Sequence, residues 1–188
     1  MSLPTQARNW VREGFLISTD KKLLSILAIN SVFDQEFMYW TKAVPDEVLQ
    51  QMIDNSFCFG LYKTIQNTPT DSVGTEATST VDHTEAALSK DLEQIGFARL
   101  ITDNITFAYL TDLYVLPGYQ GLGLGGWLID CVDELLGSLP YLRWVMLRTS
   151  KKKSKESYEK RLGMSVLRSG EISEGPVMMG KKGKAGMA

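Results

Sequence analysis

At 188 residues the chain is long enough to bury one hydrophobic core and short for two, so we expect a single domain over residues 1–188. Its net charge of −2 gives no overall attraction for polyanions, which argues against a nucleic-acid partner. The sequence contains neither an apolar run of signal-peptide length near its start nor the roughly 20 apolar residues of a membrane span. We therefore expect a cytoplasmic protein without a membrane partner, present as a monomer or a homodimer.

The first third of the chain predicts two helices between two strands. The run GFLIST at 14–19 is typical of a strand, and Asp20 is placed to cap a helix over 21–33. Pro45 is tolerated at the first position of a second helix, which an apolar stripe supports. The run SFCFGLY at 56–62 predicts the next strand.

The second half predicts a hairpin followed by alternating helices and strands. The runs at 94–102 and 105–115 are joined by Asp103 and Asn104, which tolerate the left-handed backbone of a tight turn, so they predict an antiparallel pair. Apolar residues at helical spacing then predict a helix over 124–137. The remaining elements are a strand at 143–149, a helix at 154–162, a strand at 164–169 and a last edge strand at 176–180. The hairpin makes the predicted sheet mixed.

Two segments contain too few apolar residues to pack against a core. Residues 63–91 are rich in Thr, Ser, Asp and Glu, so we expect a long mobile surface loop. The tail at 181–188, KKGKAGMA, has little to bury, and we expect it to be disordered.

Glycines gather between the strand that ends at Val115 and the helix that follows. Gly121, Gly123 and Gly126 satisfy the GxGxxG pattern of dinucleotide sites, but the strand before them belongs to a hairpin and the next strand ends in Arg148 where an acid is required. No Lys follows these glycines, which excludes a P-loop. Free amides at a helix start suit a pyrophosphate. A nicotinamide-dependent oxidoreductase and a tight turn without a ligand stay open as alternatives.

The stretch QGLGLG at 120–125, preceded by YVLP, resembles the acyl-CoA-binding motif of the GCN5-related N-acetyltransferase (GNAT) superfamily. In that motif, Gln or Arg, two residues, Gly, one residue, and Gly or Ala lie between the fourth strand and the third helix. The order of elements from about residue 14 to residue 180 is also similar, and YEKRLG at 158–163 resembles the family's Tyr-containing helix followed by Leu-Gly. The resemblance covers most of the chain.

This resemblance implies a fold and an activity. The expected fold is the GNAT acyl-CoA N-acyltransferase fold, a mixed α/β sheet of six to seven strands with helices on both faces. The expected enzyme is an acyltransferase that moves an acetyl group from acetyl-CoA to a primary amine of a small molecule or peptide, by direct attack in a ternary complex. No metal is expected. A module that binds acyl-CoA without catalysis would carry the same glycine motif and stays open as an alternative.

The resemblance also implies where acetyl-CoA binds. Backbone N–H groups near the end of the fourth strand would hold the thioester carbonyl, and pantetheine would add to the strand edge. The family often has Asn after the fifth strand, where this chain offers the hydroxyls of Thr149 and Ser150. The candidate cofactor-binding residues are Leu113, Tyr114, Val115, Gln120, Gly121, Leu122, Gly123, Leu124, Gly125, Gly126 and Ser150.

Two side chains are candidates for catalysis. An alkylamine has a pKa of about 10.4, so its ammonium must lose a proton before attack. Asp112 is the nearest carboxylate in the sequence to the expected acetyl position, and strand alternation sets it with Tyr114 on the face opposite Leu113 and Val115. It acts either as a base or as a group that positions the acceptor or stabilises the hairpin. The resemblance implies Tyr158 as the proton donor to the thiolate, although YEKRLG has one residue more before its Gly than is usual, which leaves a packing role open.

Other catalytic chemistries find little support in the sequence. The chain has two cysteines, Cys58 and Cys131, with no CxxC, and its single histidine, His83, lies in the predicted loop. We expect both cysteines to be buried free thiols. The acceptor is not indicated, because the aromatic run VFDQEFMYW either lines an acceptor pocket or packs in the core. The residues in question are Phe33, Phe37, Met38, Tyr39 and Trp40.

Overall fold

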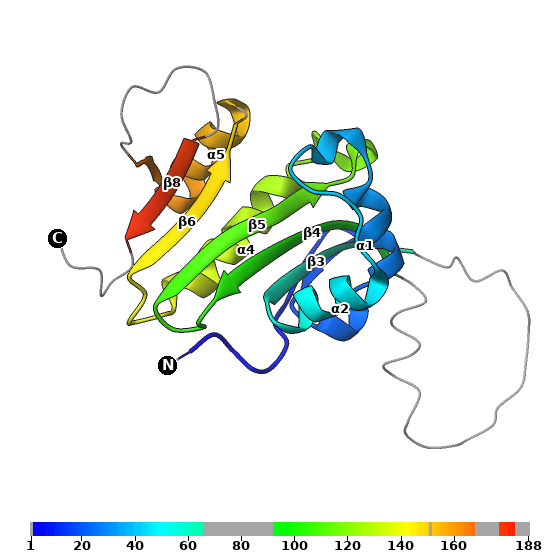
Figure 1. Cartoon of the computed structure of the whole chain (residues 1–188), viewed down its shortest axis with the longest axis horizontal. Helices are drawn as coiled ribbons and strands as arrows, with labels where there is room; N and C mark the ends of the chain where they lie inside the picture. Colours follow the sequence, from blue (N-terminus) through cyan, green and yellow to red (C-terminus); the bar gives the residue numbers. More distant parts are fainter. Residues whose placement is uncertain (1, 66–91, 151, 168–176, 183–188) are drawn as a thin grey trace, which may run out of the picture.

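The computed structural model describes residues 2–65, 92–150, 152–167 and 177–182. Within these residues, eight strands form one sheet in the order β1-β2-β3-β4-β5-β6-β8-β7 (Figure 1). The strands are β1 (Asn9–Arg12), β2 (Phe15–Ser18), β3 (Phe57–Thr64), β4 (Leu92–Thr102), β5 (Phe107–Val115), β6 (Trp144–Thr149), β7 (Ser165–Val166) and β8 (Val177–Lys182). The helices are α1 (Ile26–Phe33), α2 (Asp46–Asp54), α4 (Leu124–Gly137) and α5 (Lys152–Leu162), with short 3-10 turns η1 (Lys21–Leu23), η2 (Glu36–Met38) and η3 (Pro117–Tyr119).

The sheet combines antiparallel and parallel pairs. Strands β1 to β5 form an antiparallel meander, β5 and β6 run parallel, and β8 is antiparallel to both β6 and β7. Helix α4 makes the crossover that a parallel pair requires. The predicted mixed α/β sheet, with a hairpin ahead of the glycine segment, is therefore confirmed.

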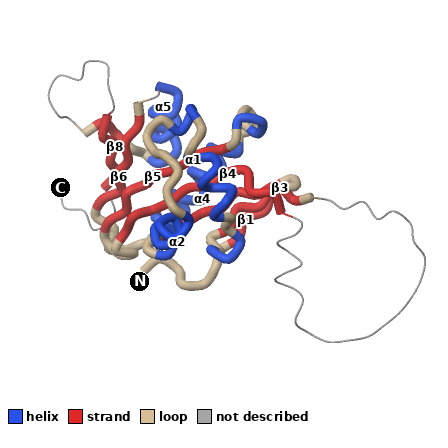
Figure 2. Tube along the Cα trace, turned by 45° about the vertical axis from the view of Figure 1, so that its right-hand side comes forward, coloured by secondary structure: helices blue, strands red, loops and turns tan. Residues whose placement is uncertain are grey.

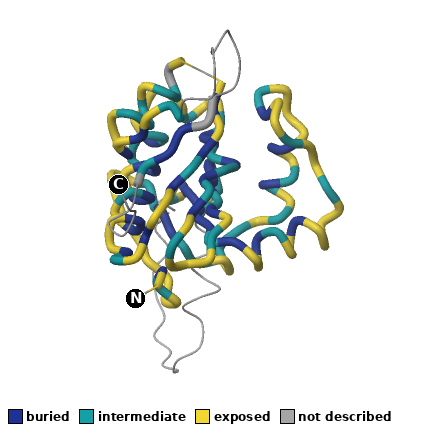
Figure 3. Tube along the Cα trace, turned by 60° about the vertical axis from the view of Figure 1, so that its left-hand side comes forward, coloured by how far each residue is buried: buried dark blue, intermediate teal, exposed yellow. Residues whose placement is uncertain are grey.

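Helices cover both faces of the sheet, as the sequence predicts (Figures 1 and 2). Helix α4 packs side chains such as Leu128 and Val132 on one face, and α1 and α2 pack Ile29 and Leu49 on the other. Figure 3 shows the buried positions along the strands and the inner sides of these helices. A fully buried side chain of this size stabilises the fold by about 2 kcal/mol. Two apolar layers thus hold the sheet between them.

Strand β1 is the one strand of the described residues that the sequence does not predict, which makes eight strands in place of six or seven. Its four residues show no apolar alternation, and Trp10 alone is partly buried. The Trp10 ring stacks on Phe59, with 6.2 Å between ring centroids, and its Nε1 donates to Glu134 at 2.8 Å. Gly14, with φ of 81°, allows the tight turn into β2. Long-range contacts therefore form this strand.

The prediction of one continuous helix over 21–33 is wrong. Asp20 does accept a hydrogen bond from a backbone N–H at 3.0 Å, but it caps only the short turn η1. Leu24 is extended, with ψ of 130°, and Ser25 caps α1. The Ser25 backbone N–H donates to the side chain of Gln94 at 2.8 Å. The Ser25 hydroxyl, which accepts from the Ala28 N–H at 3.2 Å, and this bond to β4 together fix the start of α1.

The predicted boundaries of four other segments also change. Lys63 and Thr64, expected in the loop, continue β3 because they pair with Glu93 and Leu92. Lys181 and Lys182, expected in the tail, belong to β8, which lies between β6 and β7 and is not an edge strand. Of the strand expected at 164–169, Ser165–Val166 form β7, and residues 168 and 169 lie outside the described residues. The rest of the predicted loop and tail, 66–91 and 183–188, lies outside the described residues.

The turn between β4 and β5 is confirmed at Asp103 and Asn104, and it extends to Thr106. Asn104 adopts the left-handed conformation, with φ of 65°. One carboxylate oxygen of Asp103 accepts the backbone N–H groups of Ile105, Thr106 and Phe107 at 3.0, 2.8 and 3.0 Å. The other accepts the Thr106 hydroxyl at 2.5 Å. The Asp103 side chain thus satisfies four donors of the turn, while the Asn104 N–H donates to Thr102 Oγ1 at 2.8 Å.

Replacement of Asp103 by Ala is expected to lower stability most at neutral pH. The hydrogen bonds, first that from the Thr106 hydroxyl, hold the pKa of the Asp103 carboxyl below its ordinary value of 3.8. Because the pKa is depressed in the folded state, the carboxylate's contribution is complete above that value and is lost as the pH falls towards the folded-state pKa. Urea unfolding near neutrality and at about pH 3 measures the free energy of unfolding of parent and variant. The difference between the two proteins should be smaller at about pH 3. A difference of equal size at both pH values would contradict this assignment.

Both cysteines are buried free thiols, as expected. Cys58 lies in the layer formed by α1 and α2, and Cys131 lies in the layer formed by α4. Burial raises the pKa of each thiol to about 12. Neither thiol is therefore a nucleophile in the folded protein.

Candidate active site

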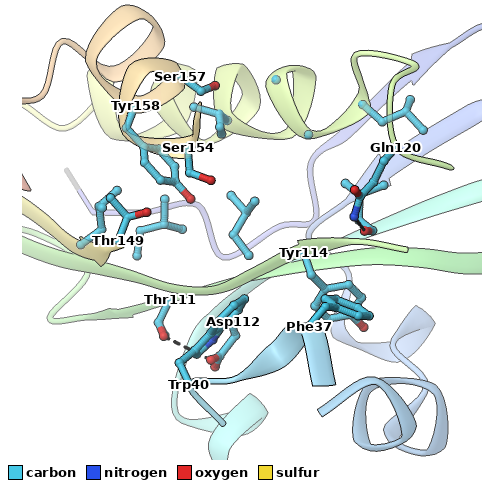
Figure 4. Close-up of a pocket in the computed structure, with 18 of the residues that line it drawn as sticks. Phe37, Trp40, Thr111, Asp112, Tyr114, Gln120, Thr149, Ser154, Ser157 and Tyr158 are labelled. Carbon is cyan, nitrogen blue, oxygen red and sulfur yellow. Dashed lines mark hydrogen bonds between the residues drawn. The ribbon is translucent and has the colours of Figure 1, made fainter. Parts of the chain in front are cut away.

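A cleft opens where β5 and β6 stop pairing. Phe107–Leu110 pair with Trp144–Leu147, and the two strands separate beyond these residues. The cleft has a volume of about 1120 Å³. Its walls are the ends of β5 and β6, the start of α4, one side of α5 and the segment around η2 (Figure 4). The site is thus created by the divergence of a parallel strand pair.

A β-bulge in β5 borders this cleft. Phe97 pairs with Tyr114 and Arg99 pairs with Thr111, so two residues of β5 lie opposite one residue of β4. Asp112 takes the left-handed conformation, with φ of 53°. This conformation costs a residue other than glycine on the order of 1–3 kcal/mol. As a result, Thr111 and Asp112 both project to the side of Trp40 (Figure 4).

The glycine segment forms an open N-terminus for α4. Gly121 and Gly123 have φ of 88° and 76°, and Gly123 is the N-cap residue without a side-chain cap. The first helical hydrogen bond runs from the Trp127 N–H to the Gly123 carbonyl, which leaves the three preceding amides without a helical partner. A Cβ atom added at Gly121 or Gly123 would meet nothing within 4 Å. The backbone that leads into α4 therefore borders open space at Gly121 and Gly123.

The other two glycines that line the cleft, Gly125 and Gly126, have different surroundings. A Cβ at Gly125 would be 3.7 Å from Val115, an ordinary contact, so neither strain nor crowding requires glycine there. A Cβ at Gly126 would lie 2.6 Å from the guanidinium of Arg161, which pairs with Asp130 at 2.5 Å. A side chain at Gly126 would therefore have to displace the Arg161 guanidinium, which is the far end of a flexible side chain.

Gln120 anchors the start of this loop. Its Nε2 donates to the Val115 carbonyl at 2.9 Å, which ties the loop back to the last residue of β5 (Figure 4). Leu122, in contrast, is 55% exposed and lies outside the cleft. The loop therefore presents backbone to the cleft more than side chains.

Tyr158 projects from α5 into the cleft, on the side of β5 opposite Asp112 (Figure 4). Ser154 and Ser157 line the same wall, one turn and one residue before it. Burial, with a smaller contribution from Tyr39, raises the pKa of Tyr158 to about 12. Its hydroxyl is therefore protonated at physiological pH and can donate a hydrogen bond.

Asp112 is buried in an ion pair. Its Oδ2 accepts from Arg99 Nε at 2.8 Å, and its Oδ1 accepts from the Thr111 hydroxyl at 3.2 Å. Arg99 also donates to Ser56 Oγ at 3.1 Å. Asp112 and Tyr114 do share one face of β5, as predicted (Figure 4). Because both carboxylate oxygens already accept hydrogen bonds and the charge is compensated, these contacts favour the structural interpretation of Asp112 over a base.

Asp112→Asn is expected to lower the free energy of unfolding by about 1–3 kcal/mol, because Arg99 would remain buried without a counter-charge. Urea unfolding measures this loss. Thr111→Val is the matched control, since it removes one hydrogen bond at the same bulge and keeps the ion pair. If Asp112→Asn left stability unchanged and lowered kcat, the base interpretation would be favoured instead.

Aromatic side chains of the η2 segment form the opposite wall. Phe37, Tyr39 and Trp40 line the cleft, whereas Phe33 and Met38 are buried in the core. The run VFDQEFMYW therefore contributes some side chains to the cleft and others to the core. The Tyr39 hydroxyl is hydrogen-bonded to Ser150 Oγ, so the η2 segment is tied to the end of β6 across the cleft.

Comparisons with known proteins agree with this geometry. Residues 85–162 match the family model described as "Acetyltransferase (GNAT) domain". A Gibberella zeae protein named "Putative acetyltransferase" is 37% identical over 164 residues, which cover 87% of this chain and 86% of that protein. The chain belongs to the GNAT family.

Solved GNAT structures share the fold. A GNAT-family protein from Xanthomonas campestris pv. campestris is 29% identical with a TM-score of 0.57, covering 84% of this chain and 93% of that one. Spermidine N-acetyltransferase from Vibrio cholerae, solved with CoA and spermine, has a TM-score of 0.59 at 13% identity, covering 90% and 95%. As a GNAT member, this chain is an acyltransferase.

The GNAT cleft brings together most of the residues that the sequence indicated. Gly121 and Gly123 lead into the open amides at the start of α4, and Tyr158 lies on the wall formed by α5. Leu122 is the exception. The predicted site residues that line the cleft are Asp112, Leu113, Tyr114, Val115, Gln120, Gly121, Gly123, Leu124, Gly125, Gly126, Ser150 and Tyr158.

Several lining residues of this GNAT site are absent from the sequence prediction. Ser154 lies four residues before Tyr158, so the one-face rule for helices could have identified it, and Ser157 lies three residues after Ser154 on the same side of the helix. Arg148 and Tyr109 alternate with buried residues on β6 and β5, but no sequence signal shows that these strands diverge. Only the tertiary structure shows that Arg148 and Tyr109 line the cleft.

Neither a metal site nor a membrane helix is found in the part of the chain that the structure describes. There, no group of three or more His, Cys, Asp and Glu side chains could hold a metal ion. Of the helices in these segments, none is both long and apolar enough to cross a bilayer.

Proposed function

We propose that this GNAT enzyme transfers an acetyl group from acetyl-CoA to a primary amine of a small molecule or peptide, by direct attack in a ternary complex. The observation that carries the proposal is the cleft between β5 and β6. It connects the open amides of the glycine segment with an aromatic wall on the other face of the sheet. Two substrates can therefore meet at the same strand end from opposite sides.

The start of α4 fits a pyrophosphate. Three successive amides at a helix N-terminus donate hydrogen bonds and carry partial positive charge. At Gly121 and Gly123 no side chain stands between this backbone and a ligand. When bound, acetyl-CoA would supply the thioester to be cleaved.

The free edge of β5 fits the pantetheine arm. β6 pairs with β5 only as far as Leu110, so the backbone groups of residues 111–115 that face β6 have no strand partner. They can hydrogen-bond an extended chain, and an N–H among them can hold the thioester carbonyl as negative charge develops. Leu113 and Val115 contribute through their backbone in this proposal.

Tyr158 is proposed to stabilise the leaving thiolate. An alkyl thiol has a pKa of about 8.5, so it is a stronger acid than a phenol whose pKa is raised to about 12. The hydroxyl therefore donates a hydrogen bond that strengthens as charge develops on sulfur. For Asp112 we infer that it holds the bulge and Arg99, and that the ammonium loses its proton to water in the open cleft.

The test is calorimetry with acetyl-CoA followed by an amine panel in which released thiol is read. Micromolar binding and amine-dependent thiol release are expected. An inactive binding module would bind acetyl-CoA and release no thiol with any amine. An oxidoreductase would be stabilised against heat by NAD(P) and not by coenzyme A, because a ligand that binds only the folded state raises its stability.

A further inference from the structure

The acceptor side of the cleft is the face of the sheet on which α1 and α2 lie. Phe37 and Trp40 line it and lie on this side of β5 with Asp112 (Figure 4). On β6, Leu147 and Thr149 are buried towards α4 and α5, so strand alternation places Arg148 on the acceptor side.

The charges of this wall do not balance. Asp112 and Arg148 are the two residues with a full charge at neutral pH among the described lining residues. Asp112 is already compensated by Arg99 at 2.8 Å. Arg148 is exposed, and within the described residues it has no ion-pair partner. Among the described residues, therefore, the Arg148 guanidinium on the acceptor side lacks a carboxylate partner.

This charge selects against one class of amine and for another. A polyamine brings a second ammonium next to Arg148, and in the described part of the wall no unpaired carboxylate receives it. A carboxylate on the acceptor, in contrast, can form two parallel hydrogen bonds with the guanidinium. The rings of Phe37 and Trp40 offer apolar area for the body of such a molecule.

We propose that the acceptor is a small primary amine with an aromatic or apolar body and a carboxylate, and that Arg148 selects it through that carboxylate. This proposal rests on the acetyl transfer proposed above. It assigns Arg148 to acceptor specificity and excludes polyamines and carboxylate-free amines as preferred acceptors.

The test compares amines that differ only in the carboxylate. Phenylalanine is paired with phenethylamine and aminomethylbenzoate with benzylamine, so that two separations between the amine and the carboxylate are sampled, and spermidine is added. In at least one pair the carboxylate member should have a kcat/KM about tenfold higher, and spermidine should be the poorest acceptor. Arg148→Glu should bring the ratio within that pair to one or below.

Arg143→Glu is the matched control, because this exposed arginine precedes β6 outside the cleft and its replacement makes the same change in net charge. It should leave the ratio within each pair as in the parent. Acetyl-CoA binding by calorimetry shows that each variant is folded with an intact glycine segment.

The outcomes separate this proposal from the proposed function. Equal kcat/KM within both pairs, a ratio unchanged by Arg148→Glu, or spermidine as the best acceptor would overturn the acceptor class and leave acetyl transfer standing. So would transfer to the carboxylate-free amines with none to a carboxylate-bearing amine. Absence of acetyl-CoA binding would instead contradict the proposed function itself.

Discussion

Tyr158→Phe is expected to lower kcat by about 10²- to 10³-fold, the range for loss of one hydrogen-bond donor to charge that develops in the transition state. Acetyl-CoA affinity should stay within about threefold, because the hydroxyl matters mainly when charge develops on sulfur. The ring packs against the core next to α4, and Phe preserves that packing. Single-turnover kinetics and calorimetry measure the two quantities separately.

The matched control is Tyr119→Phe. Tyr119 also lines the cleft, but its hydroxyl donates to Glu93 at 2.8 Å on the surface. The same chemical change at this position should leave kcat nearly unaltered. If Tyr158→Phe kept kcat within about threefold of the parent, a change of under about 1 kcal/mol in barrier, the donor role would be rejected. The acyltransferase assignment would be unaffected.

Gly123→Val is expected to weaken acetyl-CoA binding by about 100-fold or more, which corresponds to about 2.7 kcal/mol. A β-branched residue is strained at the Gly123 φ of 76°, and its side chain would occupy the open space in front of the α4 amides. The helix start would then lose both its geometry and its access to a phosphate. Calorimetry on a folded variant measures the effect.

Substitutions at two other glycines serve as controls for Gly123→Val. Gly118→Val is the matched control, since its Cβ also meets nothing within 4 Å, its φ lies outside the left-handed region and it is not part of the cleft lining. It should bind acetyl-CoA like the parent. Gly125→Ala should fold normally, because its Cβ meets Val115 at an ordinary distance. Unchanged affinity in folded Gly123→Val would mean that the phosphate lies elsewhere.

What the sequence predicted correctly rests on local patterns. The turn at Asp103 and Asn104 and the helix that begins after Gly123 follow from turn chemistry and periodicity, whereas helices on both faces of the sheet were implied by the family resemblance. These signals are contained within a dozen residues, so they can be recognised without a partner segment. The motif from Gln120 onward is of the same kind.

What the sequence did not predict depends on distant contacts. Asp112 at the bulge pairs with Arg99 of β4, and the backbone before α1 is bonded to Gln94 of β4. The bond from Tyr39 to Ser150 joins residues 111 positions apart. No periodicity encodes such pairs, which is why the acceptor wall emerged only with the fold.

The burial of Cys58 and Cys131 has a practical consequence. Thiol reagents need the thiolate, and a pKa of about 12 leaves almost none at neutral pH, so the folded enzyme should contribute little background when free coenzyme A is titrated. Slow labelling of the protein then reports transient opening. Because the two thiols lie in different apolar layers, single replacements by Ala would allow the transient opening of each layer to be measured separately.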